Sequence, residues 1–147
     1  MAYVSNADVI ERMGASTVVQ LADDNGDGTA DTGVLDEARL SAEAEVNSYL
    51  ARRYQTPINL VVHPELTDML AGITLDLVED RLRSRRPPVS EDVVRRAEST
   101  RAWLERLADG TVELPSVASV ASGSTRGVVA QSSGEERTLS REELADF

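Results

Sequence analysis

The sequence predicts an all-α fold, in which a small bundle of three to four main helices is followed by an extended C-terminal arm. Apolar residues recur every three or four positions over three long segments, and proline, serine or glycine residues stand at the ends of those segments. Aromatic residues make up only 3% of the chain, whereas a large β-sandwich needs more of them in short alternating runs. The chain therefore divides into a helical domain, residues 1–110, and an arm, residues 111–147.

The N-terminal part predicts two short helical segments and a polar loop. Ser5 is a good N-cap for a helix over residues 6–13, which Gly14 ends. Ser16 can cap a second short turn, and the polar residues 23–33 follow it without an apolar anchor.

A long amphipathic helix is predicted from Val34 to Tyr54, because its apolar residues follow the helical period. Pro57 ends this helix, since the residue before a proline avoids the helical conformation, and residues 57–63 form an extended connector. The apolar stripe of this helix comprises Leu35, Ala38, Ala42, Val46, Tyr49, Leu50 and Tyr54.

Two further helices follow the connector. Pro64 suits the first turn of one of them, and Pro87 and Pro88 stop it. Ser90 caps the other, which ends at Gly110. The buried stripes comprise Leu66, Met69, Leu70, Ile73, Leu77 and Leu82 in the first helix and Val93, Ala97, Thr100, Leu104 and Leu107 in the second.

The composition excludes several classes of function. The chain has no cysteine, which excludes a thiol nucleophile and a cysteine-bound metal, and its single histidine, His63, excludes a site that needs two imidazoles. The sequence also contains no nucleophile-elbow serine motif and no phosphate-binding loop. No apolar run is long enough to span a membrane, and the N-terminus does not resemble a signal peptide. We therefore expect a soluble intracellular protein that is not an enzyme.

The charge is acidic and unevenly distributed. The net charge is −11, of which residues 1–50 carry −8, residues 51–110 carry zero and residues 111–147 carry −3. A basic surface is needed to bind phosphates, so this balance argues against free duplex DNA as a tight partner. All fifteen basic residues are arginines, whose planar guanidinium groups suit ion pairs at interfaces.

The polar loop carries the first half of a calcium-binding pattern. Alternate positions supply side-chain oxygens, a glycine stands where a sharp turn is needed, and Thr29 offers a backbone carbonyl. The twelfth position, where a bidentate glutamate should close the site, is Val34, so only Asp36 or Glu37 could close it. Two interpretations stay open: a solvated turn, or a weak structural Ca²⁺ site. The candidate ligands are Asp23, Asn25, Asp27, Thr29 and Asp31.

An arginine cluster surrounds the two prolines. Nucleic-acid binding is one interpretation, but no aromatic residues stand between the arginines, so we favour protein contacts. Because residues 1–50 have a large acidic excess, we expect these arginines to pair with acids of a neighbouring subunit or another partner. The predicted interface residues of this cluster are Arg81, Arg83, Arg85 and Arg86.

The arm is too polar to bury enough surface by itself. Two β-like runs, residues 117–121 and 126–131, flank a Ser-Gly-Ser-Thr loop and can pair as a hairpin. The arm is either a mobile tail or a segment that orders on a partner, and we expect the second. Its predicted interface residues are Val117, Val120, Val128 and Val129.

The order of these features resembles a known family. The short helix NADVIERM is followed by QLAD, the Asp/Gly-rich loop, and AEAEVNSYLARRY running into Pro57. Mu-like tailed-phage head–tail adaptor (connector) proteins have a similar order, with patterns such as D-L-I-x-R-F-G, L-T-D-x-x-G-D-G and A-E-I-D-S-Y-L-x-x-R-Y-x-x-P. The resemblance covers residues 3 to about 110, and Met13 and the long arm depart from it.

This resemblance implies a structural protein of the virion neck, assembled in the cytoplasm of the bacterial host. About twelve copies would form a ring below the portal protein, contact the next neck or tail-completion protein, and surround the path of the DNA without binding it specifically. No enzymatic activity, required cofactor or membrane contact is implied. Two alternatives remain: a calcium-binding helical regulatory protein, and a small hydrolase or nuclease. Val34 counts against the first, and the missing ligand set counts against the second.

Overall fold

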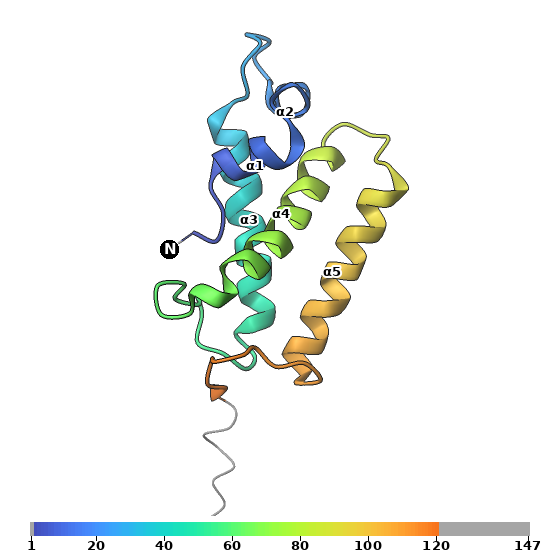
Figure 1. Ribbon diagram of the computed structural model, residues 1–147. Coiled ribbons are helices and arrows are strands. Elements are labelled where there is room, and N and C mark those ends of the chain that lie inside the picture. The colour runs from blue at the N-terminus through green and yellow to red at the C-terminus, as the bar shows by residue number, and fades with distance from the viewer. Residues whose placement is uncertain (1, 121–147) are drawn as a thin grey trace, which may run out of the picture.

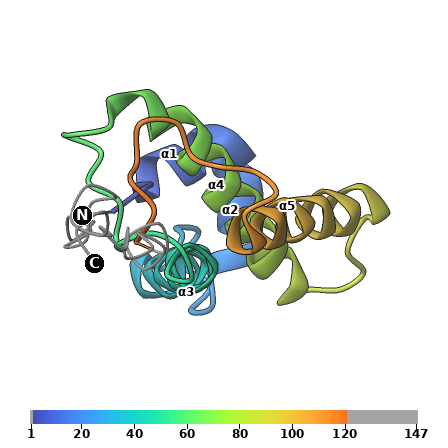
Figure 2. The same ribbon diagram turned by 90° about the horizontal axis from the view of Figure 1, so that it is seen from below.

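The computed structural model describes residues 2–120, in which helix α4 is the central element and contacts every other α-helix. Helices α3, α4 and α5 alternate in direction (Figure 1) and occupy three corners of a bundle when seen along its axis (Figure 2). Helices α1 and α2 cover one end of α3 and α4. The elements are α1 (Asn6–Met13), α2 (Ala15–Ala22), α3 (Thr32–Leu50), the 3₁₀ turn η1 (Pro64–Leu66), α4 (Thr67–Ser84) and α5 (Glu91–Asp109).

The described residues are entirely helical or irregular, which confirms the all-α prediction. The three long helices share one core, and each contributes side chains from its predicted apolar stripe. Ile73 of α4 is only partly buried. Thr74 also lies in this core, where its hydroxyl donates to the Leu70 carbonyl at 2.7 Å and so has a partner away from water. The fully buried members include Val46, Leu50, Leu70, Leu77, Leu104 and Leu107.

The predicted ends of α1 and α5 are correct. Ser5 caps α1 through a capping box, in which its hydroxyl accepts from the Asp8 amide and the Asp8 carboxylate accepts from the Ser5 amide. These hydrogen bonds lower the pKa of Asp8, the bond from the Ser5 backbone contributing most. Gly110 follows α5 with φ of 81°, a left-handed conformation that glycine adopts without steric cost.

Three predicted boundaries are wrong. Helix α2 begins at Ala15 behind Gly14, so Ser16 lies inside the helix and is not its cap. Helix α3 ends at Leu50 and not at Tyr54, because the chain tightens into a turn in which the Arg53 and Tyr54 amides both donate to the Leu50 carbonyl. This turn carries Tyr54 into the core, where it is 2% exposed.

The third error concerns the connector after α3. Residues 59–63 fold back as a turn, in which the Val62 and His63 amides donate to the Asn59 carbonyl, so the connector is not extended there. Pro64 begins the 3₁₀ turn η1 and not α4 itself. Together, the connector and η1 bury Ile58, Leu60 and Leu66, so they close one end of the core.

Candidate functional site

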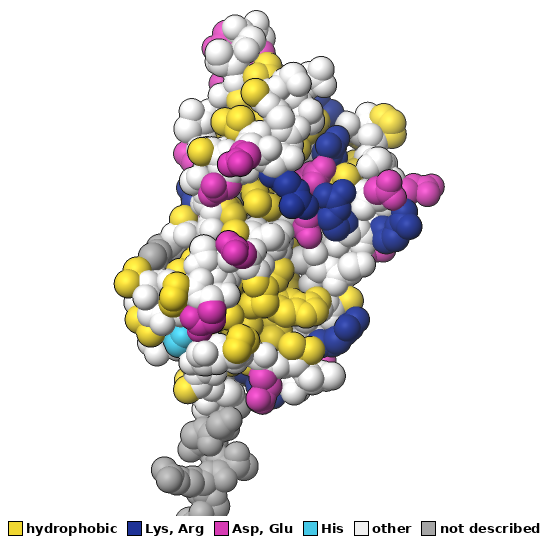
Figure 3. Space-filling model, viewed as in Figure 1, with side chains coloured by type: hydrophobic (Ala, Val, Ile, Leu, Met, Phe, Trp, Pro, Cys, Tyr) yellow, Lys and Arg dark blue, Asp and Glu magenta, His cyan; other side chains and the backbone are white. Residues whose placement is uncertain are grey.

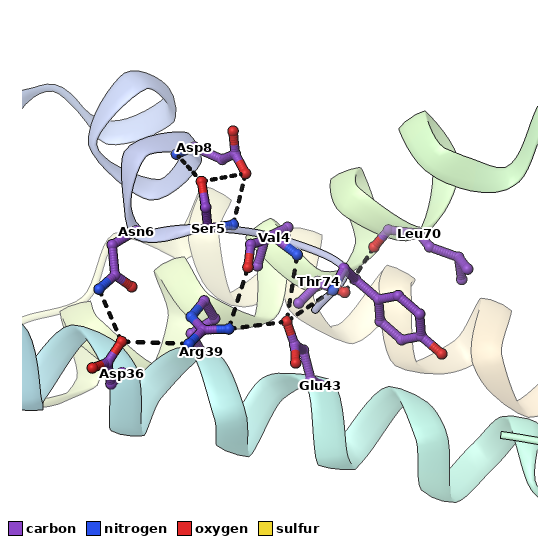
Figure 4. A network of polar contacts seen from close by, with 10 residues as sticks. Val4, Ser5, Asn6, Asp8, Asp36, Arg39, Glu43, Leu70 and Thr74 are labelled. Carbon is purple, nitrogen blue, oxygen red and sulfur yellow. Dashed lines mark hydrogen bonds and ion pairs between the residues drawn. The ribbon is translucent and has the colours of Figure 1, made fainter. Parts of the chain in front are cut away.

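The N-terminal segment is fixed to α3 by a buried glutamate, as Figure 4 shows. Glu43 accepts hydrogen bonds from the Tyr3 amide at 3.0 Å and the Val4 amide at 3.4 Å, and Arg39 lies 3.5 Å from the same oxygen. The Tyr3 hydroxyl donates to Asn47 at 2.6 Å and accepts from the Ile58 amide at 2.9 Å. One tyrosine therefore joins the N-terminus, α3 and the connector.

A second tyrosine fixes the beginning of the arm. The Tyr54 hydroxyl accepts a hydrogen bond from the Leu114 amide at 2.9 Å, and Leu114 itself is 4% exposed. A residue that belongs to the apolar stripe of the sequence thus also makes a polar contact with the beginning of the arm. The local sequence gives no signal of this contact, because the amide that the Tyr54 hydroxyl binds lies sixty residues away in the chain.

Arg53 fixes the same segment at two further points. Its carbonyl accepts from the Val120 amide at 2.7 Å, and its guanidinium forms an ion pair with Glu113 at 3.0 Å. The guanidinium also lies over Gly110, where an added Cβ would be 1.4 Å from a guanidinium nitrogen. Residues 110–120 therefore follow the end of α3 closely.

The carboxylates of the acidic loop, residues 23–31, accept hydrogen bonds from amides and side chains of the loop itself. Asp23 accepts from the Gly26 amide at 2.6 Å and the Gly28 amide at 2.9 Å, and both glycines have positive φ. Asp31 accepts from the Asp24 amide and the Asn25 side chain, each at 2.9 Å. These carboxylates therefore fold the loop through its backbone.

The predicted calcium ligands lie together in this loop, but their side-chain oxygens accept hydrogen bonds from other groups of the loop. Hydrogen bonds from Thr29, chiefly from its side chain, lower the pKa of Asp27. Of the two carboxylates that could close the site, Asp36 is bound by Asn6 and Arg39, and Glu37 is exposed on α3. Val34, at the twelfth position, packs against the core. Within residues 2–120 no group of three or more His, Cys, Asp or Glu side chains is placed to hold a metal ion. The hydrogen bonds of the loop favour the interpretation as a turn, and the weak Ca²⁺ site stays untested.

The arginines after α4 bind this loop. Arg85 forms an ion pair with Asp24 at 2.5 Å and donates to the Leu21 carbonyl at 2.9 Å. Arg86 donates to the Asp23 carbonyl at 2.8 Å. The acidic N-terminal half and the arginine cluster are thus complementary, and in the single chain they already pair with each other.

The other two predicted interface arginines belong to ion pairs within the bundle. Arg81 of α4 binds Glu45 of α3 at 2.6 Å, and Arg101 of α5 binds the same carboxylate at 2.8 Å. Burial acts to raise the pKa of Glu45, but the hydrogen bonds from Arg101 and Arg81 outweigh it and hold that pKa below its usual value. Glu45 therefore links all three long helices.

A second carboxylate behaves similarly. Glu79, which is 6% exposed, accepts from Arg83 of α4 and Arg96 of α5, each at 2.8 Å. The pair with Arg83 lies within α4, whereas the pair with Arg96 bridges α4 and α5. The role of Arg81, Arg83, Arg85 and Arg86 in contacts between subunits stays a prediction.

The predicted interface valines divide into two groups. Val117 is partly buried against the core and Val120 is 58% exposed, whereas Val128 and Val129 lie outside the described residues. The first predicted strand run forms no strand over residues 117–120, and the second run also lies outside the described part. The hairpin is therefore untested.

Exposed apolar side chains gather at the end of the bundle where the arm leaves. Val61 and Val62 of the connector turn are 75% and 64% exposed, and apolar surface covers much of the lower half of the face shown in Figure 3. A groove of about 450 Å³ opens between the connector and residues 117–118. We call Val61, Val62, Val120 and this groove the arm end of the molecule.

Comparison with known proteins identifies the family. None of the described helices is both long and apolar enough to cross a bilayer. No curated protein matches the chain. The family model described as "Bacteriophage Mu, Gp36" matches residues 3–131, which is most of the chain and includes the loop, the three long helices and the beginning of the arm. The protein is therefore a phage protein and belongs to the bacteriophage Mu Gp36 family.

Proposed function

We propose that this protein is the head–tail adaptor of a tailed phage, a subunit of a ring of about twelve copies that joins the portal to the tail. Membership of the Mu Gp36 family is the observation that carries the proposal. The motif that is similar to adaptor proteins lies at the end of α3 and in the connector, and it includes Tyr49, Arg53, Tyr54 and Pro57. Arg53 and Tyr54 are the residues that hold the arm.

The bundle has the properties of a rigid ring subunit. Glu45 and Glu79 join α3, α4 and α5 through partly buried ion pairs, so the helices are fixed relative to one another by more than apolar packing. Removing one partner from such a pair leaves a buried charge without compensation, which disfavours alternative arrangements of the helices. A subunit that transmits force between capsid and tail benefits from this rigidity.

The charge also suits a conduit. A net charge of −11 on each copy would make a ring of about twelve copies strongly negative, and a lumen that shares this charge would repel the phosphate backbone. DNA would then slide through without specific binding. The proposal accordingly describes a structural component of the virion neck, with the portal and the next neck protein as partners, and not an enzyme or a membrane protein.

The test is assembly with the portal. The full chain is purified alone and mixed with the portal protein of the same phage, and both samples are examined by native mass spectrometry and negative-stain electron microscopy. We expect rings of about twelve copies, formed alone or on the portal, and immunogold label at the neck of intact virions. A chain that stays monomeric in both samples and is missing from purified virions would overturn the proposal.

A further inference from the structure

The groove at the arm end has walls from two distant segments of the chain. The connector contributes Pro57, Ile58 and Val62, and the beginning of the arm contributes Val117 and Ala118. Gln55, Asn59 and His63 add polar groups to the same lining. A lining that mixes apolar and polar groups in this way suits an extended peptide, which offers both apolar side chains and backbone groups that need partners.

The surroundings of the groove are also apolar. Val61, Val62 and Val120 expose between 58% and 75% of their surface within a few residues of the lining. Single exposed apolar residues are ordinary on a protein surface, but a cluster beside a groove marks an interaction site. Burying these side chains against a partner would remove apolar surface from water, which is favourable.

The chain itself supplies a suitable segment. The described part ends at Val120, beside the groove, and 27 residues follow to Phe147. These residues contain one apolar run, Gly127-Val128-Val129-Ala130, in otherwise polar sequence. The family match continues past Val120 and ends at residue 131, directly after this run, so the run belongs to the part of the sequence that the family shares.

The distance favours a second copy as the acceptor. An extended chain covers about 3.3 Å for each residue, so the path from Val120 to Val128 spans roughly 26 Å. Helices packed about 10 Å apart make a three-helix bundle roughly 20–25 Å across, which is the spacing of neighbours in a closely packed ring. A straight path therefore reaches the same groove on the next copy, whereas a return to the chain's own groove needs a reversal after Val120.

We propose that residues 126–131 of one copy occupy the groove at the arm end of the neighbouring copy, so that each arm links two subunits. The inference rests on the proposed ring. It assigns the arm to a contact between copies of this chain, and it leaves the other surfaces of the bundle to the portal and the next neck protein.

Disulfide trapping tests this contact, because the natural chain has no cysteine. Val62→Cys and Val129→Cys are made separately in the full chain, mixed before assembly, and oxidised. A disulfide needs Cα atoms within about 7 Å, so only adjacent positions react. The matched control uses Val94→Cys in place of Val62→Cys. Val94 is an exposed valine in the first turn of α5, at the end of the bundle away from the groove. Each single variant is also oxidised alone, to measure dimers between identical cysteines.

We expect a disulfide-linked dimer from the Val62→Cys and Val129→Cys mixture, in greater yield than from the control mixture or either variant alone. Mass spectrometry of the peptides should identify a disulfide that joins position 62 of one copy to position 129 of another. A second variant, Val128→Asp with Val129→Asp, should shift the ring toward smaller species, because it would bring two carboxylates against the apolar side chains Ile58, Val62 and Val117 of the groove.

The remaining outcomes separate the two proposals. Rings that form without the mixed disulfide would overturn the arm contact and leave the adaptor function intact. A further variant carries both Val62→Cys and Val129→Cys in one chain. A disulfide that forms within this chain, with none between the chains of the mixture, would show that the arm fills its own groove, which also overturns the inference. Failure to form rings under any condition would overturn the proposed function and the inference with it.

Discussion

At one end of the bundle, Arg85 and Arg86 bind the acidic loop, whereas the opposite end leaves Val61, Val62 and Val120 exposed beside a groove. At the first end, the arginines already pair with carboxylates and carbonyls of the same chain. A partner would therefore have to break these contacts before it formed new ones. The second end exposes apolar surface that gains by being covered. The contrast indicates that the arm end is the better candidate for contacts between copies.

Helix α4 packs against the helices at both ends of the bundle, so a cavity in its core should cause the largest loss of stability. Leu70→Ala should lower the free energy of unfolding by about 2–5 kcal/mol, because Leu70 is fully buried and a cavity would remain. Urea unfolding followed by circular dichroism measures this change. Leu40→Ala is the matched control, since Leu40 is 56% exposed on α3 and should change stability by less than about 0.5 kcal/mol.

The next largest effect should be at the arm end. Tyr54→Phe removes the acceptor of the buried Leu114 amide and should cost about 1–3 kcal/mol. Tyr49→Phe is the control, because the Tyr49 hydroxyl makes no hydrogen bond to residues 2–120. Amide hydrogen exchange should show faster exchange at Leu114 in Tyr54→Phe only. Equal exchange in the two variants would mean that this hydroxyl does not hold the arm.

The corresponding change at the acidic end should be smaller. Arg85→Ala with Arg86→Ala should cost no more than about 1 kcal/mol, since the side chains are 35% and 50% exposed and such pairs are screened by solvent. The loss should shrink further in 1 M salt. A cost as large as that of Tyr54→Phe would remove the contrast between the two ends.

The ion pairs between the helices should add a dependence on acid. The folded-state pKa of Glu45 lies below its usual value, so its contribution is present above the unfolded pKa and is lost as pH falls through the folded pKa. Glu45→Gln should therefore be less stable than the natural protein at pH 7, and the two should converge in strongly acidic solution. Thermal unfolding across this range measures the difference, and a constant gap at every pH would contradict this role of Glu45.

Calcium should have the smallest effect. Because the loop carboxylates already accept backbone amides, we expect flat calorimetric titrations with Ca²⁺ for both the natural chain and Asp27→Ala. Heat that appears in the natural chain and is lost in Asp27→Ala would instead support the calcium-binding interpretation. It would also show that the acidic end is a ligand site and not a closed turn.

The three long helices could be predicted because their apolar period and their proline and glycine stops are local properties of the sequence. The end of α3 was misjudged, since Tyr54 fits the helical period but is turned inward toward Leu114, sixty residues away. The charge partners within the chain could not be predicted for the same reason. Arg85 and Asp24 have opposite charges, but only the fold determines whether such charges pair within one chain or between two chains.

The hold of α3 on residues 110–120 has a mechanical consequence. The Arg53 carbonyl and the Tyr54 hydroxyl receive the Val120 and Leu114 amides, so a pull on the arm acts first on the C-terminal end of α3. That end is continuous with the helix that Glu43 and Tyr3 join to the N-terminus, and Glu45 joins it to α4 and α5. A pull on residues 110–120 would therefore be transmitted along α3 to the N-terminal segment and, through Glu45, to α4 and α5.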